Sequence, residues 1–404
     1  MTTRVLYLAA GNPIRPSVGM DLVIRQHLTE LAMDKSIQLT AVAVAPGIPG
    51  SQDVGYFPVG GSGVHVFVGD LIGEKRGLRR FWSKLKFVLL RDVPVMAYSF
   101  KSLSAQRFIG DLLRKGHFDV IVVDHYYTLA NVSLKDINRA GSKLVYISHD
   151  AMLPHIAEMA SMRKDPVSKI YYYLEAIRTH WVEQRLFARA TRIVHLSEYE
   201  CRRVKVCVER HLALLPPIAG SAVSPGEAAA LDYAHSVLFI GAPAHPPNAH
   251  AIDWILHRLS PALAKREPKL KIVLIGGGTQ CVQSDYGNVQ GLGFVSQSEL
   301  QRALGSAIGA ISPVVLGRGI KVKVLDAIAA GCPVWATEES LRGFEQFGLD
   351  ANLSLNAPDA LVDEIVQLAK QPHRREQVKA KLVAAWQHFM LSRPGQLAQL
   401  ITKC

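Results

Sequence analysis

Two patterns of apolar residues alternate along the chain. Short continuous apolar runs, such as Val5–Ala9, Asp119–Asp124 and Lys271–Ile275, are typical of parallel strands buried on both faces. Between such runs lie longer stretches, such as Met20–Met33 and Asn248–Lys265, in which apolar residues recur at helical spacing. Strands that alternate with helices in this way predict an α/β protein with doubly wound parallel sheets.

A stretch rich in proline, glycine and small residues interrupts this alternation between Leu214 and Gly226. Since ~150 residues is a common domain size, a chain of 404 residues accommodates two or three domains. We therefore expect a Rossmann-like domain over 1–217, a linker over 218–235, a second Rossmann-like domain over 236–372, and a helical segment over 373–404 that packs on the first domain.

The most informative stretch is Ser312–Thr337, whose residue types read as strand, glycine turn, helix, glycine and strand. Gly317 and Gly319 form the turn before the helix. A helix that begins at such a turn presents unpaired N–H groups and a partial positive charge, which favour phosphate. Lys321 and Lys323 lie at this helix start, where cations oppose the helix dipole unless an anion binds.

Asp326 follows Lys323 by three residues and therefore shares its face of the helix, one turn further on. A lysine for the phosphates and a carboxylate for the ribose hydroxyls suit a nucleoside diphosphate. The same spacing also fits a surface ion pair on an ordinary amphipathic helix, and the residues alone leave both interpretations open.

Further candidates lie where predicted strands end. His149 and Asp150 follow the strand Leu144–Ser148, and three glycines from Gly276 onward follow the strand Lys271–Ile275. Open α/β sheets bind ligands at these carboxyl ends. A capping or hydrogen-bonded histidine explains His149 as well, and a plain turn explains Gly276.

Residues 74–91 predict a basic amphipathic helix. Phe81 and Trp82 belong to its apolar face, and seven lysines and arginines surround that face. This composition is typical of a helix that lies on an anionic membrane surface, although a core helix with a solvated back fits too. Residues 1–216 carry 29 Lys and Arg against 19 Asp and Glu, which indicates an anionic partner for this half.

The remaining composition narrows the class of protein. Five cysteines without a CxxC pair indicate reduced thiols, and they show no metal-ligand spacing. The first strand begins at Arg4, which leaves no room for a signal peptide, and no apolar run reaches the ~20 residues of a membrane span. Few aromatic residues accompany the basic ones, so we expect no nucleic-acid partner. We expect a cytoplasmic protein that is peripheral at the inner face of the membrane.

The sequence GRGIKVKVLDAIAAGCPVWAT, from Gly317 onward, resembles the donor-site segment of glycosyltransferase family 4. Many bacterial polysaccharide-type members of this family read G-x-x-x-K-V-L-E-A-M-A-x-G-x-P-V-V-A-T there. The resemblance extends upstream through Val237–Gly241, Pro247–Trp254, Val273–Gly276 and Leu292–Val295. It departs at Arg318 and Asp326, where the family often has two glutamates separated by seven residues, and this departure leaves the donor sugar open.

The resemblance implies a GT-B fold, in which two Rossmann-like domains face a cleft, the first on the acceptor side and the second binding the nucleotide sugar. It implies a retaining, metal-independent transferase with no cofactor other than its nucleotide diphosphate sugar donor, and a lipid-linked saccharide acceptor used in surface polysaccharide assembly. The implied catalytic residues are His149 and Asp150. The implied donor-binding residues are Gly19, Gly276, Val295, Arg318, Gly319, Lys321, Lys323 and Asp326.

Three other functions stay open at this point. A GT-B-fold sugar-nucleotide epimerase would form product from the donor alone. A nucleic-acid binder would lose affinity steeply with salt. A non-catalytic partner subunit would bind nucleotide without turning it over.

Overall fold

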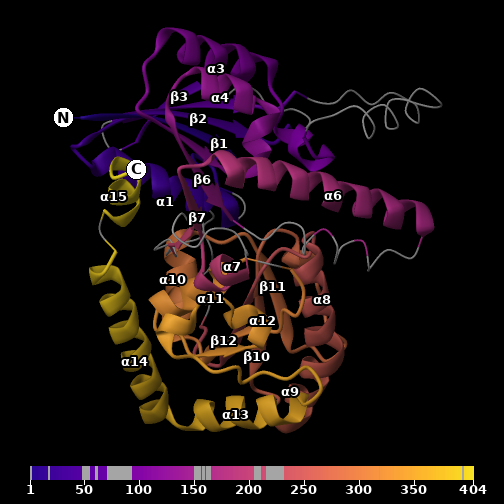
Figure 1. Cartoon of the computed structure of the whole chain (residues 1–404). Coiled ribbons are helices and arrows are strands. Elements are labelled where there is room, and N and C mark those ends of the chain that lie inside the picture. Colours follow the sequence, from indigo (N-terminus) through magenta and orange to yellow (C-terminus); the bar gives the residue numbers. More distant parts are fainter. Residues whose placement is uncertain are drawn as a thin grey trace. The chain divides into compact units, whose positions relative to one another are not determined.

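The computed structural model describes residues 2–16, 19–47, 55–59, 62–70, 93–149, 156, 160, 165–203, 211–214, 232–317, 319–393 and 395–404. The chain forms two compact units (Figure 1). Unit 1 comprises Met1–Pro216 together with Gly395–Cys404, and unit 2 comprises Pro217–Pro394. Most of the expected linker and the whole segment 74–91 lie outside the described residues.

Unit 1 is built on a sheet whose strands follow the order β3-β4-β2-β1-β5-β6-β7-β8, parallel except for β3. At its centre Val5 of β1 is paired with Leu39 of β2 and Val120 of β5. The strands are β1 (Thr3–Ala10), β2 (Ile37–Ala45), β3 (Gly55–Val59), β4 (Ser62–Val68), β5 (Val120–Asp124), β6 (Lys143–Ser148), β7 (Arg192–His195) and β8 (His211–Ala213).

The helices and 3-10 turns of unit 1 cover both faces of this sheet. They are α1 (Gly19–Met33), η1 (Val95–Phe100), α3 (Leu103–Lys115), η2 (Tyr126–Ala130), α4 (Leu134–Arg139), α6 (Pro166–Arg189), α7 (Glu198–Arg203) and α15 (Gln396–Thr402). On one face Leu8 of β1 shares a buried cluster with Ile137 of α4 and Leu186 of α6. Tyr7, which precedes Leu8 in β1, instead contacts His27 of α1 on the opposite face.

Unit 2 contains a smaller, wholly parallel sheet with the order β11-β10-β9-β12-β13. Consecutive residues of β9 face separate cores: Phe239 packs with Trp254 of α8, and Leu238 packs with Ala327 of α11. The strands are β9 (Ser236–Ile240), β10 (Lys271–Ile275), β11 (Val289–Gly293), β12 (Gly309–Ser312) and β13 (Val334–Ala336).

The helices of unit 2 are α8 (Pro246–Trp254), the π-turn η4 (Ile255–Leu259), α9 (Ser260–Arg266), η5 (Thr279–Cys281), α10 (Gln297–Ser306), α11 (Val322–Ala329), α12 (Glu338–Leu341), η6 (Glu345–Phe347), α13 (Pro358–Lys370) and α14 (Pro372–Leu391). The C-terminal helices divide between the units. Helix α14 packs on α11 and α13, whereas α15 packs on α1, where the Leu397 N–H donates to Glu30 Oε1 at 2.8 Å.

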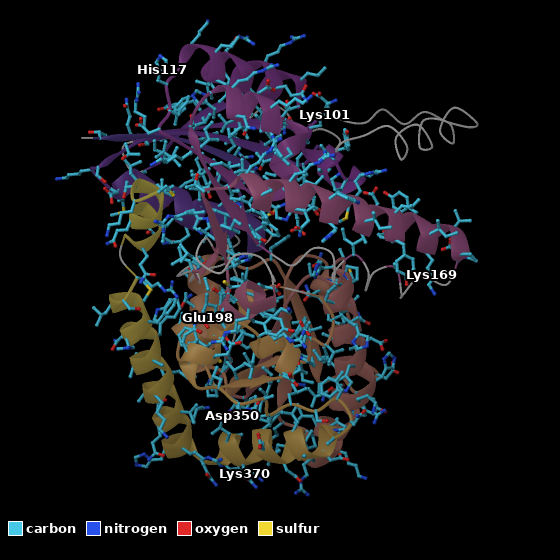
Figure 2. The ribbon with its side chains drawn as sticks, in the orientation of Figure 1. Lys101, His117, Lys169, Glu198, Asp350 and Lys370 are labelled. Atoms are coloured by element: carbon cyan, nitrogen blue, oxygen red, sulfur yellow. The ribbon has the colours of Figure 1, made fainter. Side chains whose placement is uncertain are left out.

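Charged side chains on the outer helices, such as Lys169 on α6 and Lys370 at the end of α13, point away from their units (Figure 2). Across the described residues, no helix combines the length and the apolarity that crossing a bilayer requires. The predicted α/β class with two Rossmann-like parallel sheets is confirmed.

Candidate functional site

The loops at the carboxyl edge of the unit 2 sheet lie unusually close together. Gly276, which follows β10, has a φ of 145°, and a Cβ atom there would lie 2.7 Å from the carbonyl carbon of Gly241, which follows β9. Gly317, which follows β12, has a φ of 83° and would place a Cβ atom 3.1 Å from Pro247. These positions accept only glycine without strain, and they let three loops converge on one edge.

Lys323 in the first turn of α11 lies at this edge. Its Nζ donates to Asn248 Oδ1 at 2.6 Å and lies 4.3 Å from the centre of the Phe239 ring. Burial, and secondarily the charge of Lys321, lowers the pKa of Lys323 to about 7. No carboxylate of the described part of the chain pairs with this ammonium. The site therefore carries positive charge that a bound anion would balance.

Lys321 has a different environment. It is the N-cap residue of α11, and its side chain makes no capping hydrogen bond. Its Nζ donates to the carbonyls of Gly317 at 3.3 Å and Gly319 at 2.9 Å, and lies 3.8 Å from Glu339. Lys321 therefore bonds to the glycine loop that precedes it and leaves the first N–H groups of α11 without a cap from its own side chain.

Asp326 is fully buried inside α11. An exposed ion pair with Lys323 is therefore not what the structure shows, because Lys323 turns to Asn248 instead. A ribose contact by Asp326 stays a prediction, and it would require the carboxylate to become accessible.

The remaining donor-site candidates differ in how they are held. The Gly276 N–H donates to Gly293 O at 2.8 Å, which ties the loop after β10 to the end of β11. Val295 is half-buried against the core of unit 2. Gly319 has a φ of 74°, and Gly19 is the first residue of α1 in unit 1. Arg318 lies outside the described residues.

Phe294, beside Val295, is a feature that the sequence reasoning missed. Its ring is 63% exposed and lies against Gly277, where a Cβ atom would come within 2.4 Å of the ring. An exposed aromatic ring on a carboxyl-edge loop offers a stacking surface for a nucleobase. The glycine run that starts at Gly276 was the available sequence signal, because any side chain at Gly277 would collide with the Phe294 ring.

A second set of polar side chains is buried at the carboxyl edge of the unit 1 sheet. Asp124, the last residue of β5, accepts a hydrogen bond from Tyr7 and contacts His149 Nε2 just beyond β6. His27 of α1 places Nδ1 3.3 Å from Asp124 and 3.1 Å from Tyr7 Oη. All four side chains are buried. Asp150, the other catalytic candidate, lies outside the described residues.

Asp124 supplies the carboxylate of this cluster. Burial alone would raise the pKa of this carboxyl, but His149 and then His27 bind the carboxylate and hold its pKa well below the usual range. Burial and the nearby Asp124 raise the pKa of Tyr7 well above its ordinary value, so the phenol stays protonated. Asp124 therefore orients two histidines, one of which is the sequence candidate His149.

His125 adds a strained backbone to this edge. It has a φ of 67° and a ψ of 142°, a conformation that residues other than glycine rarely adopt. Its Nδ1 accepts from the Tyr127 N–H at 3.3 Å, and burial lowers its pKa well below the ordinary value, so the ring is neutral. The sequence signal for Asp124 and His125 was present: Asp124 ends a buried strand and His125 follows it, much as His149 and Asp150 follow the next strand.

Comparisons with solved structures identify this architecture as the GT-B fold of glycosyltransferases, as the resemblance implied. Anabaena Alr3699/HepE in complex with UDP-glucose matches with a TM-score of 0.60 at 13% identity, covering 99% of this chain and 100% of that one. The E. coli protein described as trehalose-6-phosphate bound with UDP-2-fluoro glucose matches with a TM-score of 0.58 at 14% identity, covering 98% and 99%.

Sequence comparison locates the family signal in unit 2. Residues 234–371 match the model of the family "Glycosyl transferases group 1". A Klebsiella pneumoniae protein described as an uncharacterized 44.6 kDa protein in the cps region is 23% identical over 251 residues. This match covers 59% of the chain and spans 61% of that relative's length.

Proposed function

We propose that the protein transfers a sugar from a nucleoside diphosphate sugar to a saccharide acceptor. The observation that carries this proposal is the unbalanced ammonium of Lys323 beside the uncapped start of α11. Charge develops on the departing diphosphate as the glycosidic bond breaks, and preorganised cations and N–H groups stabilise it. The group 1 glycosyltransferase match over the same unit supports this assignment.

The donor would lie along the carboxyl edge of the unit 2 sheet. Its diphosphate would meet Lys323 and the start of α11, and its base would stack on Phe294 near Val295. Uracil is the first base to test, because two proteins of the same fold are described with UDP-sugars. In this proposal Lys323 and the helix start supply the positive charge, so the transfer is metal-independent.

The unit 1 cluster would serve the sugar side of the reaction. His149 lies at a strand end where ligands bind, and Asp124 fixes its ring through Nε2. A histidine held by a buried carboxylate is well suited to hydrogen-bond a hydroxyl that changes charge in the transition state. Retention at the anomeric carbon is part of the proposal and depends on the family resemblance.

The proposed acceptor is a lipid-linked saccharide of surface polysaccharide assembly. The relative in a cps region supports this assignment, and so does the basic composition of residues 1–216.

The test begins with ligand binding and then measures turnover. UDP-, GDP- and dTDP-sugars are each added, and the rise in melting temperature is measured, since a ligand of the native state stabilises it by RT ln(1+[L]/Kd). The sugar that protects is then incubated with and without lipid-linked saccharide extracts.

We expect nucleoside diphosphate release that depends on the acceptor extract. Conversion of the donor to an epimer without acceptor would replace transfer with epimerisation. Protection without any turnover in the presence of acceptor would leave a nucleotide-binding subunit and refute transfer.

A further inference from the structure

Helix α6 of unit 1 carries an apolar stripe on its exposed side. Five large apolar residues recur at steps of three and four, and each is between 44% and 79% exposed: Val167, Ile170, Leu174, Ile177 and Trp181. In Figure 1 the helix extends beyond the edge of the unit 1 sheet. A helix that served only the core of this unit would bury such a stripe.

The charges of α6 are sorted by sign between its two sides. Both of its acidic residues, Glu175 and Glu183, are buried, and Glu175 accepts from the Val95 N–H at 2.6 Å and pairs with Arg178. The exposed charges within the helix are basic, and the exposed Asp165 lies before it as the N-cap. The solvent side of α6 is therefore apolar and cationic.

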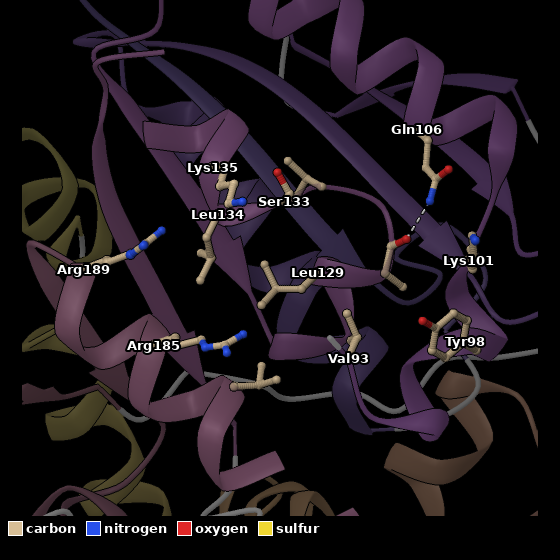
Figure 3. A pocket seen from close by; sticks show the side chains of 13 residues that line it. Val93, Tyr98, Lys101, Gln106, Leu129, Ser133, Leu134, Lys135, Arg185 and Arg189 are labelled. Carbon is tan, nitrogen blue, oxygen red and sulfur yellow. Dashed lines mark hydrogen bonds between the residues drawn. The ribbon is translucent and has the colours of Figure 1, made fainter. Parts of the chain in front are cut away.

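The stripe leads into a basic cavity. Arg185 and Arg189 follow Trp181 at successive steps of four residues, so they continue its side of the helix. Together with Lys101 and Lys135 they line a cavity of about 730 Å³, and its described lining residues include no carboxylate (Figure 3).

Between these cations, part of the cavity wall is apolar. Leu129, Val132 and Val182 form part of it, and Gln106 is held in place by a 2.8 Å hydrogen bond to Ala130 O. None of the four cations pairs with a carboxylate among the described residues. The chemistry that fits is an anionic phosphate attached to an apolar body.

We propose that this surface, the α6 stripe with its adjoining basic cavity, binds a bilayer that contains anionic phospholipid. Tryptophan and tyrosine favour the interface between headgroups and acyl chains, and Trp181 and Tyr173 lie on the exposed part of α6. Lipid phosphates enter the cavity beside Arg185 and Arg189. The surface is independent of the proposed sugar transfer and differs from segment 74–91.

The test is cosedimentation of the full chain with vesicles of phosphatidylcholine, with and without phosphatidylglycerol, at low and high salt. Arg185→Gln with Arg189→Gln removes two surface charges, and Ile177→Ser with Trp181→Ser removes two apolar anchors. Arg258→Gln with Lys265→Gln on unit 2 is the matched charge control, and Leu391→Ser, at a residue 81% exposed, is the apolar control.

We expect the parent to bind only the vesicles with phosphatidylglycerol. Since each basic residue near an anionic bilayer contributes ~1 kcal/mol, the arginine pair should lower affinity by roughly 10- to 30-fold at low salt. The Ile177 and Trp181 changes should remove the binding that persists at high salt. Both control variants should bind like the parent, and all melting temperatures should stay near the parent value.

Three outcomes would overturn the proposal. Vesicle binding that survives both α6 variants but is lost when Arg76, Arg79, Arg80 and Lys84 become glutamine would assign the membrane to segment 74–91. Protection against unfolding by inorganic pyrophosphate without vesicle binding would make the cavity a site for a soluble phosphate. A dimer in light scattering that Trp181→Ser dissociates, without vesicle binding, would make the stripe an interface between copies.

Discussion

Lys323→Met separates the charge of Lys323 from the bulk of its side chain. Methionine keeps an unbranched chain against Phe239 but removes the ammonium that meets Asn248. A charge-assisted hydrogen bond contributes about 1.5–3 kcal/mol, so affinity for UDP should fall roughly 10- to 100-fold. Affinity for uridine should hardly change. Calorimetry with both ligands measures the difference, and Lys265→Met, at an exposed position of unit 2, is the matched control.

The pH dependence of binding tests the same lysine. Because the pKa of Lys323 is about 7 in the free protein, it loses its proton as the pH rises above neutrality. A diphosphate binds the protonated form and raises this pKa in the complex. Parent affinity for UDP should therefore fall by up to about tenfold per unit between pH 7 and 9, above the phosphate pKa of about 6. Lys323→Met should flatten this fall.

Lys323→Met should raise the stability of the free protein although it lowers the affinity for UDP. The pKa of Lys323 in the folded protein lies below its unfolded value of 10.5, so the desolvated ammonium destabilises the free protein at and below pH 7. That cost disappears as the pH rises toward the unfolded pKa. Lys323→Met should thus melt higher than the parent at pH 7, with the gap closing by pH 10. Equal losses for UDP and uridine, or an unchanged pH profile, would refute the assignment.

Four further outcomes follow from the geometry. Phe294→Ala should lower affinity for UDP about 5- to 100-fold, since base stacking contributes ~1–3 kcal/mol, and Tyr286→Ala, at another exposed aromatic of unit 2, should not. Asp124→Asn should abolish turnover while UDP affinity stays near the parent value. Because the pKa of Asp124 is depressed in the fold, the parent loses stability as the pH falls below the unfolded value of 3.8, and Asp124→Asn should weaken that acid loss in melting scans. Gly276→Ala should lower the melting temperature, because the new methyl group meets the Gly241 backbone, whereas Gly305→Ala on α10, with open space around it, should stabilise by about 0.5–1 kcal/mol.

The strands and most helices of both units were predictable because burial on two faces leaves continuous apolar runs. Val120–Asp124 and Lys271–Ile275 form strands where the pattern placed them. The glycine turn and helix after β12 were equally visible, since Gly317 and Gly319 adopt positive φ angles that few other residues tolerate. Constraints of this kind act within one stretch of the chain, so they can be read from that stretch alone.

Partners across the fold were not predictable in this way. Residue spacing placed Lys323 and Asp326 on one helical face, but the lysine bonds to Asn248, 75 positions earlier, and the aspartate is buried. Asp124 likewise gathers Tyr7, 117 positions earlier, and His149, 25 positions later. Helical spacing describes neighbours on one element only, and the sheet register that joins distant strand ends is settled by packing.

Strand order explains the positions of Asp124 in unit 1 and Lys323 in unit 2. In unit 1, β1 and β6 flank β5. The residue that ends β5 must therefore meet side chains from both neighbours and from the helix that follows β1. In unit 2, β10 and β12 flank β9, so Lys323 after β12 meets Asn248 after β9. The segments that follow neighbouring parallel strands thus meet at the carboxyl edge of the sheet, and in this chain they bring a carboxylate there in one unit and an ammonium in the other.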